Sequence, residues 1–176
     1  MIATARPAPA TVRRGDVALD VLVVRVALGT PARLQRVGLL VRQVHSIVRM
    51  TAGDQRLRAL PAGRWQVSYE GAWVPAHSLA RALDPDPAPA DLLPAGAEGA
   101  HLLGIRQRPG PGAGYVGLIV DDVEEILTYP LAQVRAFPRW VAPRGPAAFL
   151  WGGIPAADGA VLLLLDATAL ADRVIR

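Results

Sequence analysis

The sequence predicts a mainly β protein, with short helices, made of two related modules. Apolar residues alternate with a period of two along 20–28, and two segments in different halves of the chain repeat one pattern. Prolines are concentrated between those halves, at 84–94. Period-two alternation indicates strands, and proline at this density interrupts both helices and sheet ladders. With 176 residues, of which 52% are hydrophobic, the chain can form one substantial core or two small cores sharing an interface.

The first half is predicted to contain a disordered tail followed by a β-hairpin. Residues 1–15 are rich in Ala, Pro and Arg, a composition typical of a tail outside the fold. In the first strand, four alternating apolar residues would share one face: Leu22, Val24, Val26 and Leu28. Gly-Thr-Pro at 29–31 ends this strand, and Val37–Val41 is expected to form the second strand of the hairpin.

The second half is predicted to be a β module with one terminal helix. The expected elements are strands at His101–Arg106 and Tyr115–Val120 around a turn at 108–114, an extended segment at Leu131–Trp140, a buried strand at Val161–Leu165 and a helix at Ala167–Val174. The two modules would then cover about 16–83 and 100–176, joined by a Pro-rich linker at 84–99.

An internal repeat supports two modules. Residues 38–50 (GLLVRQVHSIVRM) and 117–129 (GLIVDDVEEILTY) share five identical aligned pairs: Gly38/Gly117, Leu39/Leu118, Val41/Val120, Val44/Val123 and Ile47/Ile126. Both segments alternate as a strand does and then place two apolar residues three apart, which predicts a helical or 3₁₀ turn there. Gly71 and Gly159 each begin a weaker second match. The alternative is that two strand–turn units of a Val-rich chain look alike without being copies.

Charge and composition argue against several classes of function. The formal charge is +4 and every cation is arginine, but the arginines are scattered and aromatic residues are few, which disfavours nucleic-acid binding. The absence of cysteine excludes disulfides, thiolate nucleophiles and cysteine-ligated metals. No apolar stretch approaches the roughly 20 residues that a membrane-spanning helix needs, so no membrane insertion is expected. These features favour a cytoplasmic protein.

No catalytic residue, cofactor site or metal site is predicted. His45, His77 and His101 share no metal-like spacing and are expected to be lone surface or strand histidines. Four acids at 121–125 are Asp121, Asp122, Glu124 and Glu125; they could hold a divalent cation, but a solvated turn with one partner-facing Glu is favoured. The glycines of 108–114 lack the spacing of a nucleotide loop, so a hairpin turn is favoured.

Trp73 is the tryptophan most typical of an interface, because it lies beside the charged residue Glu70. Trp65, Trp140 and Trp151 are instead expected to fill small-barrel cores.

The order of these segments resembles the CheW-like domain, the adaptor module of bacterial chemotaxis arrays. The clearest matches are YVGLIVDDVEEIL (115–127) and FLWGGIPAADGAVLLLLDATAL (149–170). VLVVRVAL (21–28), GLLVRQVHSIVRM (38–50) and YEGAWVPAHSLARAL (69–83) match more loosely. The resemblance covers about 17–174, so residues 16–176 would form a single CheW-like domain. It implies two five-stranded, SH3-like β-barrels packed side by side, and a non-enzymatic protein.

The resemblance also implies partners. Members of the family bridge a CheA-type histidine kinase, through its regulatory domain, and the cytoplasmic tip of a methyl-accepting chemoreceptor. On this basis three groups of residues are expected to bind partners: Val44, Ser46 and Ile47; Glu70, Gly71 and Trp73; and Val123, Glu125 and Ile126.

The first module departs from the family pattern. Ser46 stands where an acid is usual, Trp65 replaces a Gly, Glu70 replaces an Arg, and Ser78 stands where the second module keeps Asp166. A reversed charge can reject a partner. A second hypothesis is therefore a divergent scaffold for another partner, for example in a pilus or gliding signalling system. A third, of another class, is a small-ligand or enzymatic domain.

Overall fold

The computed structural model describes residues 17–29, 33–51, 56–60, 64–83, 99–108, 114–137, 148–156 and 159–174, and the statements below concern these residues. The predicted tail at 1–15, the Pro-rich segment 84–98, residues 109–113 of the predicted turn and Trp140 lie outside them.

The fold is mainly β and consists of two six-stranded sheets. Sheet A has the strand order β10-β11-β12-β2-β1-β9, and sheet B has the order β3-β7-β8-β6-β5-β4. Sheet A comprises β1 (Ala18–Leu28), β2 (Arg33–Leu40), β9 (Asp122–Pro130), β10 (Arg135–Ala136), β11 (Leu150–Pro155) and β12 (Val161–Leu165). Sheet B comprises β3 (Val44–Arg49), β4 (Leu57–Leu60), β5 (Arg64–Tyr69), β6 (Ala72–Ser78), β7 (His101–Arg106) and β8 (Tyr115–Val120).

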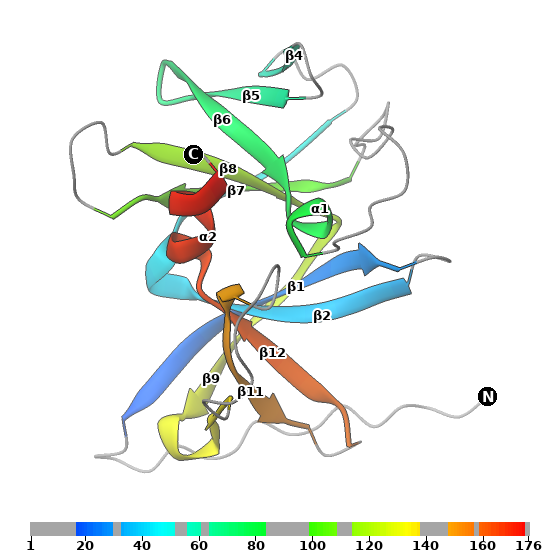
Figure 1. Ribbon diagram of the computed structural model, residues 1–176, viewed down its shortest axis with the longest axis vertical. Helices are drawn as coiled ribbons and strands as arrows, with labels where there is room; N and C mark the ends of the chain where they lie inside the picture. The colour runs from blue at the N-terminus through cyan, green and yellow to red at the C-terminus, as the bar shows by residue number, and fades with distance from the viewer. Residues whose placement is uncertain are drawn as a thin grey trace.

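Two short α-helices complete the fold, and each follows the last strand of one half of the chain. They are α1 (Leu79–Leu83) and α2 (Ala167–Val174), and both lie between the two sheets in Figure 1. The residue before each helix has a side-chain oxygen that caps it: Ser78 Oγ accepts from the Arg81 N–H, and Asp166 Oδ1 accepts from the Ala169 N–H. Ser78 therefore caps α1 as Asp166, its counterpart in the repeat, caps α2.

The internal repeat is confirmed as two copies of one strand order. The first copy runs β1–β6 and α1, and the second runs β7–β12 and α2. Corresponding strands have corresponding neighbours: β2 pairs antiparallel with β1 and parallel with β12, while β8 pairs antiparallel with β7 and parallel with β6. The predicted match of Gly71 with Gly159 also holds, because both have positive φ (78° and 80°) in the turn that precedes β6 or β12.

The sheets do not divide the chain at the Pro-rich segment. Sheet A takes β1 and β2 from the first copy and β9–β12 from the second, whereas sheet B takes β3–β6 from the first and β7–β8 from the second. The first two strands of each copy, β1–β2 and β7–β8, therefore lie in the sheet that contains the last four strands of the other copy. The halves 16–83 and 100–176 are therefore repeat units in sequence, while each sheet is built from both.

Three clusters of buried residues hold the sheets together. The shared core lies between the sheets and combines Leu22 and Leu39 of sheet A, Leu103 and Leu118 of sheet B, and residues of both helices. The sheet A core includes Val21 and Leu164, and the sheet B core includes Val67 and Leu102. Trp151 packs against the sheet A core and Trp65 against the sheet B core, as predicted.

Strand β1 is buried on both faces. Its predicted apolar face is confirmed, since Leu22, Val24 and Val26 lie in the shared core and Leu28 packs against it. The opposite face is buried as well, because Val21 and Val23 belong to the sheet A core. A strand that lies between two cores has apolar residues on both faces. The predicted alternation identified only one of these two faces.

The turn predicted at Val44–Ile47 is wrong, and a β-bulge explains the spacing. Val44–Arg49 is strand β3, preceded by a 3₁₀ turn at Val41–Gln43 (η1). Val44 is opposite Ile105 and Ser46 is opposite Gly104, so His45 is an extra residue in the ladder. An extra residue shifts the alternation by one, which puts Val44 and Ile47 on the same face of sheet B.

The second copy has the same bulge. Val123 is opposite Val24 and Glu125 is opposite Val23, which makes Glu124 the extra residue of β9. The repeated apolar pattern therefore encodes two equivalent bulged strands rather than two turns.

Several short elements differ from the sequence-based expectation. Strands β4, β5 and β11 and helix α1 were not predicted. The extended segment expected at Leu131–Trp140 contains a 3₁₀ turn at Leu131–Gln133 (η3) and the two-residue strand β10. The predicted strands at 101–106, 115–120 and 161–165 and the helix at 167–174 are confirmed.

Candidate protein-binding surfaces

The bulged strands β3 and β9 carry most of the predicted partner-binding residues. Each strand is the last in its sheet, β3 beside β7 and β9 beside β1. Val44 and Val123 pack against the shared core, whereas Ile47 is 43% exposed and Ile126 is 56% exposed. An edge strand leaves backbone groups on one side without a sheet partner. The fold thus presents one exposed isoleucine on the edge strand of each sheet, at equivalent positions.

The other predicted member of each group lies on the opposite face of its strand. Ser46 and Glu125 are aligned in the repeat, and both are half-buried. Ser46 Oγ is buried and has no hydrogen-bond partner among the described residues. Glu125 lies 3.7 Å from Arg36 through its Oε1 atom. The structure therefore separates Ser46 from Ile47, and Glu125 from Ile126, by the strand between them.

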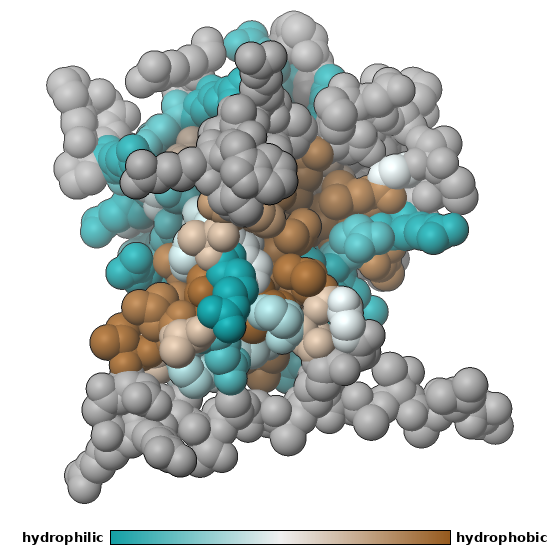
Figure 2. Space-filling view, turned by 60° about the horizontal axis from the view of Figure 1, so that its bottom comes forward, coloured by the Kyte–Doolittle hydropathy of each residue, from teal (hydrophilic) through white to brown (hydrophobic). Residues whose placement is uncertain are grey.

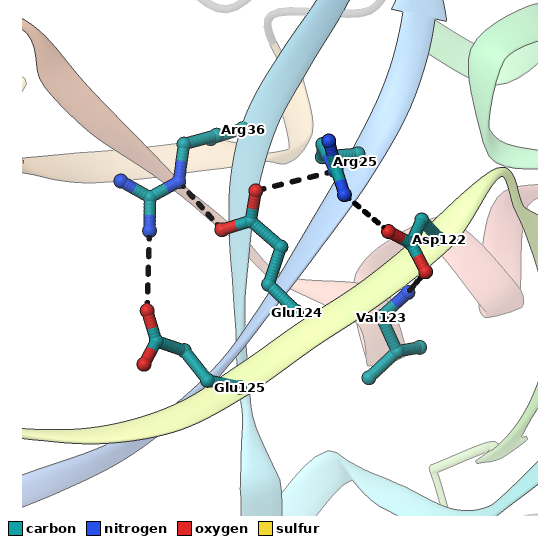
Figure 3. Close-up of polar contacts among 6 residues, drawn as sticks. All are labelled: Arg25, Arg36, Asp122, Val123, Glu124 and Glu125. Carbon is teal, nitrogen blue, oxygen red and sulfur yellow. Dashed lines mark hydrogen bonds and ion pairs between the residues drawn. The ribbon is translucent and has the colours of Figure 1, made fainter. Parts of the chain in front are cut away.

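In sheet A, an ionic network joins the edge strand β9 to strands β1 and β2. Figure 3 shows Arg25 of β1 and Arg36 of β2 in contact with three acids of β9. Arg25 pairs with Asp122 and, at 3.2 Å, with Glu124, while Arg36 Nε lies 2.8 Å from the second oxygen of Glu124. The network joins three strands through side chains that are partly exposed, so each pair contributes modestly, on the order of 1 kcal/mol or less.

The solvated acidic turn predicted at 121–125 is wrong. Asp122, Glu124 and Glu125 lie on β9 and are paired with arginines, and Asp121 Oδ2 accepts a hydrogen bond from the Ala27 backbone N–H. The arginines that pair with these acids come from β1 and β2. Arg25 is 97 residues before Asp122, and Arg36 is 88 residues before Glu124. Local sequence spacing therefore does not reveal the pairing.

The equivalent end of sheet B is aromatic rather than ionic. His45, Tyr69 and Tyr115 form a cluster in which the ring centroids of Tyr115 lie 5.0 Å from each of the other two. Arg106 lies opposite Tyr115 just as Arg25 lies opposite Arg36, and its guanidinium is 5.8 Å from the Tyr115 ring. Aligned positions of the repeat thus hold Arg36 and Glu124 in sheet A but Tyr115 and His45 in sheet B.

Glu70 contacts this aromatic cluster. Its Oε1 lies 3.3 Å from His45 Nε2, and the contact becomes an ion pair when the imidazole is protonated. Glu70 and Gly71 form the two-residue loop between β5 and β6, and both have positive φ (48° and 78°), as type I′ hairpin turns require. Of the two departures from the family pattern in this region, Glu70 contacts the His45 side chain and Ser46 follows His45 on β3.

Trp73 is not part of the Glu70 contact. It lies opposite Ser68 on the face of sheet B away from the sheet B core, and it is 41% exposed. The guanidinium of Arg58 lies 4.0 Å from the centroid of its ring. The predicted surface formed by Glu70, Gly71 and Trp73 is therefore divided between a turn and a sheet face.

The three histidines lie on three different strands: His45 on β3, His77 on β6 and His101 on β7. The described residues contain no group of three or more His, Asp or Glu side chains that could hold a metal ion. His77 on β6 is part-buried, and burial lowers its pKa below the ordinary value, with Arg81 adding to the effect. Its Nε2 atom is buried without a hydrogen-bond partner among the described residues.

Further exposed apolar residues occur on the sheet A side. Figure 2 shows apolar surface there on both sides of a hydrophilic strip. The large exposed apolar residues that belong to sheet A or adjoin it are Val17, Leu34, Ile126, Leu131 and Val161. No helix of the described residues is long and apolar enough to cross a membrane.

The two sheets are equivalent, share one core, and each carries an exposed isoleucine on an edge strand. A family model described as the CheW-like domain matches residues 20–174 of this chain. The protein therefore belongs to the CheW-like domain family.

A solved structure with the same fold is that of the scaffolding protein TtCheW from Thermoanaerobacter tengcongensis. The match has a TM-score of 0.61 with 16% sequence identity, and it covers 88% of this chain and 92% of that one. A likeness at this identity shows the fold. The comparison with curated proteins finds no matching relative.

Sequence reasoning missed most of the side chains that surround the predicted sites. The partners Arg25, Arg36, Arg58 and Tyr115 were not singled out, although the repeat aligns Arg36 with Tyr115. That alignment, extended two residues before Gly38 and Gly117, was the available signal.

Proposed function

We propose that this protein is a cytoplasmic, non-catalytic adaptor that joins the regulatory domain of a CheA-type histidine kinase to the cytoplasmic tip of a chemoreceptor. Membership of the CheW-like family supports the adaptor role. Transmission of a signal then depends on the relative position of the bound partners and needs no chemistry in the adaptor.

The observation that carries this proposal is the pair of equivalent edge strands. Ile47 on β3 and Ile126 on β9 are exposed beside the shared core, and neither is covered by another described element. Exposed apolar side chains at a sheet edge can dock against a partner strand or helix. Val44, Ser46 and Ile47 would form one docking surface, and Val123, Glu125 and Ile126 the other.

Binding measured by calorimetry tests the proposal. The kinase regulatory domain and a receptor-tip fragment are each titrated into the full-length protein, with Ile47→Asp, Ile126→Asp and the control Leu34→Asp. Leu34 is also exposed but lies away from the edge strands. We expect each edge variant to weaken one partner by about tenfold or more, with the control unchanged. Absence of binding by the unmodified protein at tens of micromolar would overturn the proposal.

The second candidate is a scaffold for a different partner, and the reversed charge at Glu70 favours it. The variant Glu70→Arg separates the two. Both side chains are subject to the same left-handed backbone conformation, so the comparison isolates charge and the His45 contact. Tighter binding of the kinase domain to Glu70→Arg would favour a changed partner; unchanged binding would show that the reversed charge carries no information about the partner.

A further inference from the structure

The two sheets differ in charge. The strands of sheet A contain four arginines (Arg25, Arg33, Arg36 and Arg135) and four acids (Asp20, Asp122, Glu124 and Glu125). The strands of sheet B contain four arginines (Arg49, Arg58, Arg64 and Arg106) and no Asp or Glu. Glu70 is the acid found in the described segments that join the sheet B strands. The positive charge of the described chain is therefore concentrated in sheet B.

One arginine of sheet B is held in a fixed position. Arg58 lies on β4, the last strand of the sheet, opposite Gln66 of β5. Its Nε atom donates to Gln66 Oε1 at 3.0 Å, and its Nη2 atom donates to the same oxygen. Its guanidinium also stacks 4.0 Å from the Trp73 ring centroid. A guanidinium has five N–H donors, and Gln66 accepts from two of them.

This geometry prepares Arg58 for a carboxylate. A guanidinium matches a carboxylate in shape and binds it with two parallel hydrogen bonds. Because stacking and the Gln66 contact already restrict the side chain, binding costs less conformational entropy than for a mobile arginine. Trp73, at 41% exposure, adds apolar area beside the charge. Tryptophan and arginine together are the residue types most enriched at binding hot spots.

We propose that the β4–β6 face of sheet B, centred on Arg58 and Trp73, binds an acidic segment of a partner protein. A carboxylate of that segment pairs with Arg58, and a neighbouring apolar side chain packs on Trp73. The inference goes beyond the proposed function, whose two docking surfaces do not include Trp73, and it names the chemistry of what binds at this third surface. An acidic peptide fits better than nucleic acid, because the sheet B strands that contain arginine hold one each and aromatic residues make up only 5% of the sequence.

Nuclear magnetic resonance of the full-length protein at low salt tests this inference. The probe is a ten-residue peptide that alternates Glu with Leu, and its control replaces every Glu with Gln. We expect saturable shifts at the Arg58 Nε–H and Trp73 indole N–H resonances with the Glu peptide and not with the Gln peptide. Arg58→Gln should weaken binding by about tenfold or more, because the charged partner of the carboxylate is lost.

Arg33→Gln is the matched control, since Arg33 is also an exposed arginine at the end of a strand but lies in sheet A. Its affinity for the Glu peptide should equal that of the unmodified protein. Equal weakening by both variants would show general attraction between opposite charges and overturn the inference, as would tighter binding of a ten-nucleotide single strand than of the Glu peptide. Trp73→Phe retains an aromatic ring and should keep the fold and part of the affinity.

Failure of this inference is distinguishable from failure of the proposed function. If the peptide does not bind while the kinase domain binds, the acidic-segment inference alone is wrong. If the peptide binds at Arg58 while neither the kinase domain nor the receptor tip binds, the adaptor proposal is wrong and the acidic-segment inference still holds.

Discussion

Gly38 and Gly117 are aligned in the repeat and pack in the same way. A Cβ atom at Gly38 would lie 2.7 Å from the Val21 side chain, and one at Gly117 would lie 2.8 Å from the Leu102 side chain. Val21 and Leu102 are themselves corresponding residues of β1 and β7, each two positions before the residue opposite the glycine. The identity of this pair therefore follows from the close packing of two neighbouring strands.

Adding one methyl group at either position should destabilise the protein. We expect Gly38→Ala and Gly117→Ala each to lower the free energy of unfolding by about 1–3 kcal/mol, because the side chains around both sites must shift. Gly114→Ala is the control, since the nearest atom to its Cβ would be 3.9 Å away. Urea denaturation measures all three. Stability losses equal to that of Gly114→Ala would contradict the packing account.

His77 should make stability depend on pH. Burial lowers its pKa in the folded protein below the ordinary 6.5, so between the two pKa values the unfolded chain binds more protons. Stability then rises with pH in this window, is complete above about pH 6.5 and is lost as the pH falls below it. We expect His77→Gln to have a flatter dependence of unfolding free energy between pH 7 and 5. A slope identical to that of the unmodified protein would refute this role.

At the scale of elements, apolar periodicity located the long strands and the terminal helix, whose buried faces dominate their sequences. It failed at Val44–Ile47, where three-residue spacing has two physical causes: a helical turn or a bulged strand. His45 and Glu124 show the second cause in both copies. The choice between them depends on the opposite strand, which comes from a distant part of the chain and is invisible to local pattern.

In the candidate site, too, the sequence predicted some residues, whereas others depend on contacts between distant segments. Ile47 and Ile126 could be named from the repeat, but the cluster of His45, Tyr69 and Tyr115 is formed by three distant segments and required the register of the strands. Likewise Trp73 and Glu70 are close in sequence, yet Trp73 lies on a face of sheet B beside Arg58, whereas the turn places Glu70 against His45.

The two halves of the chain are interdependent, because each sheet is built from both copies. In the fragment 16–83, β3 would lack β7 and β6 would lack β8, while β1 would lack β9. We expect fragments 16–83 and 100–176 each to lack a cooperative unfolding transition alone, and their mixture to regain one by circular dichroism. A cooperative transition of either fragment alone would show that one half can close its own sheets.

For the molecule as a whole, the repeat gives two equivalent edge strands, β3 and β9, with different side chains around them. The sheet A end is closed by Arg25, Arg36 and the acids of β9, whereas the sheet B end exposes an aromatic cluster beside Glu70. We expect these two regions to bind two different partners and not two molecules of the same partner, because their side chains differ and specificity depends on such differences. That asymmetry is what an adaptor between a kinase and a receptor requires.

The formation of a ternary complex tests this account most directly. The protein, the kinase regulatory domain and the receptor-tip fragment are mixed in equal amounts and analysed by sedimentation velocity. The account predicts one species with the mass of all three chains, which Ile47→Asp and Ile126→Asp each reduce to a different binary complex. Competition, in which either partner displaces the other and no ternary species forms, would contradict it.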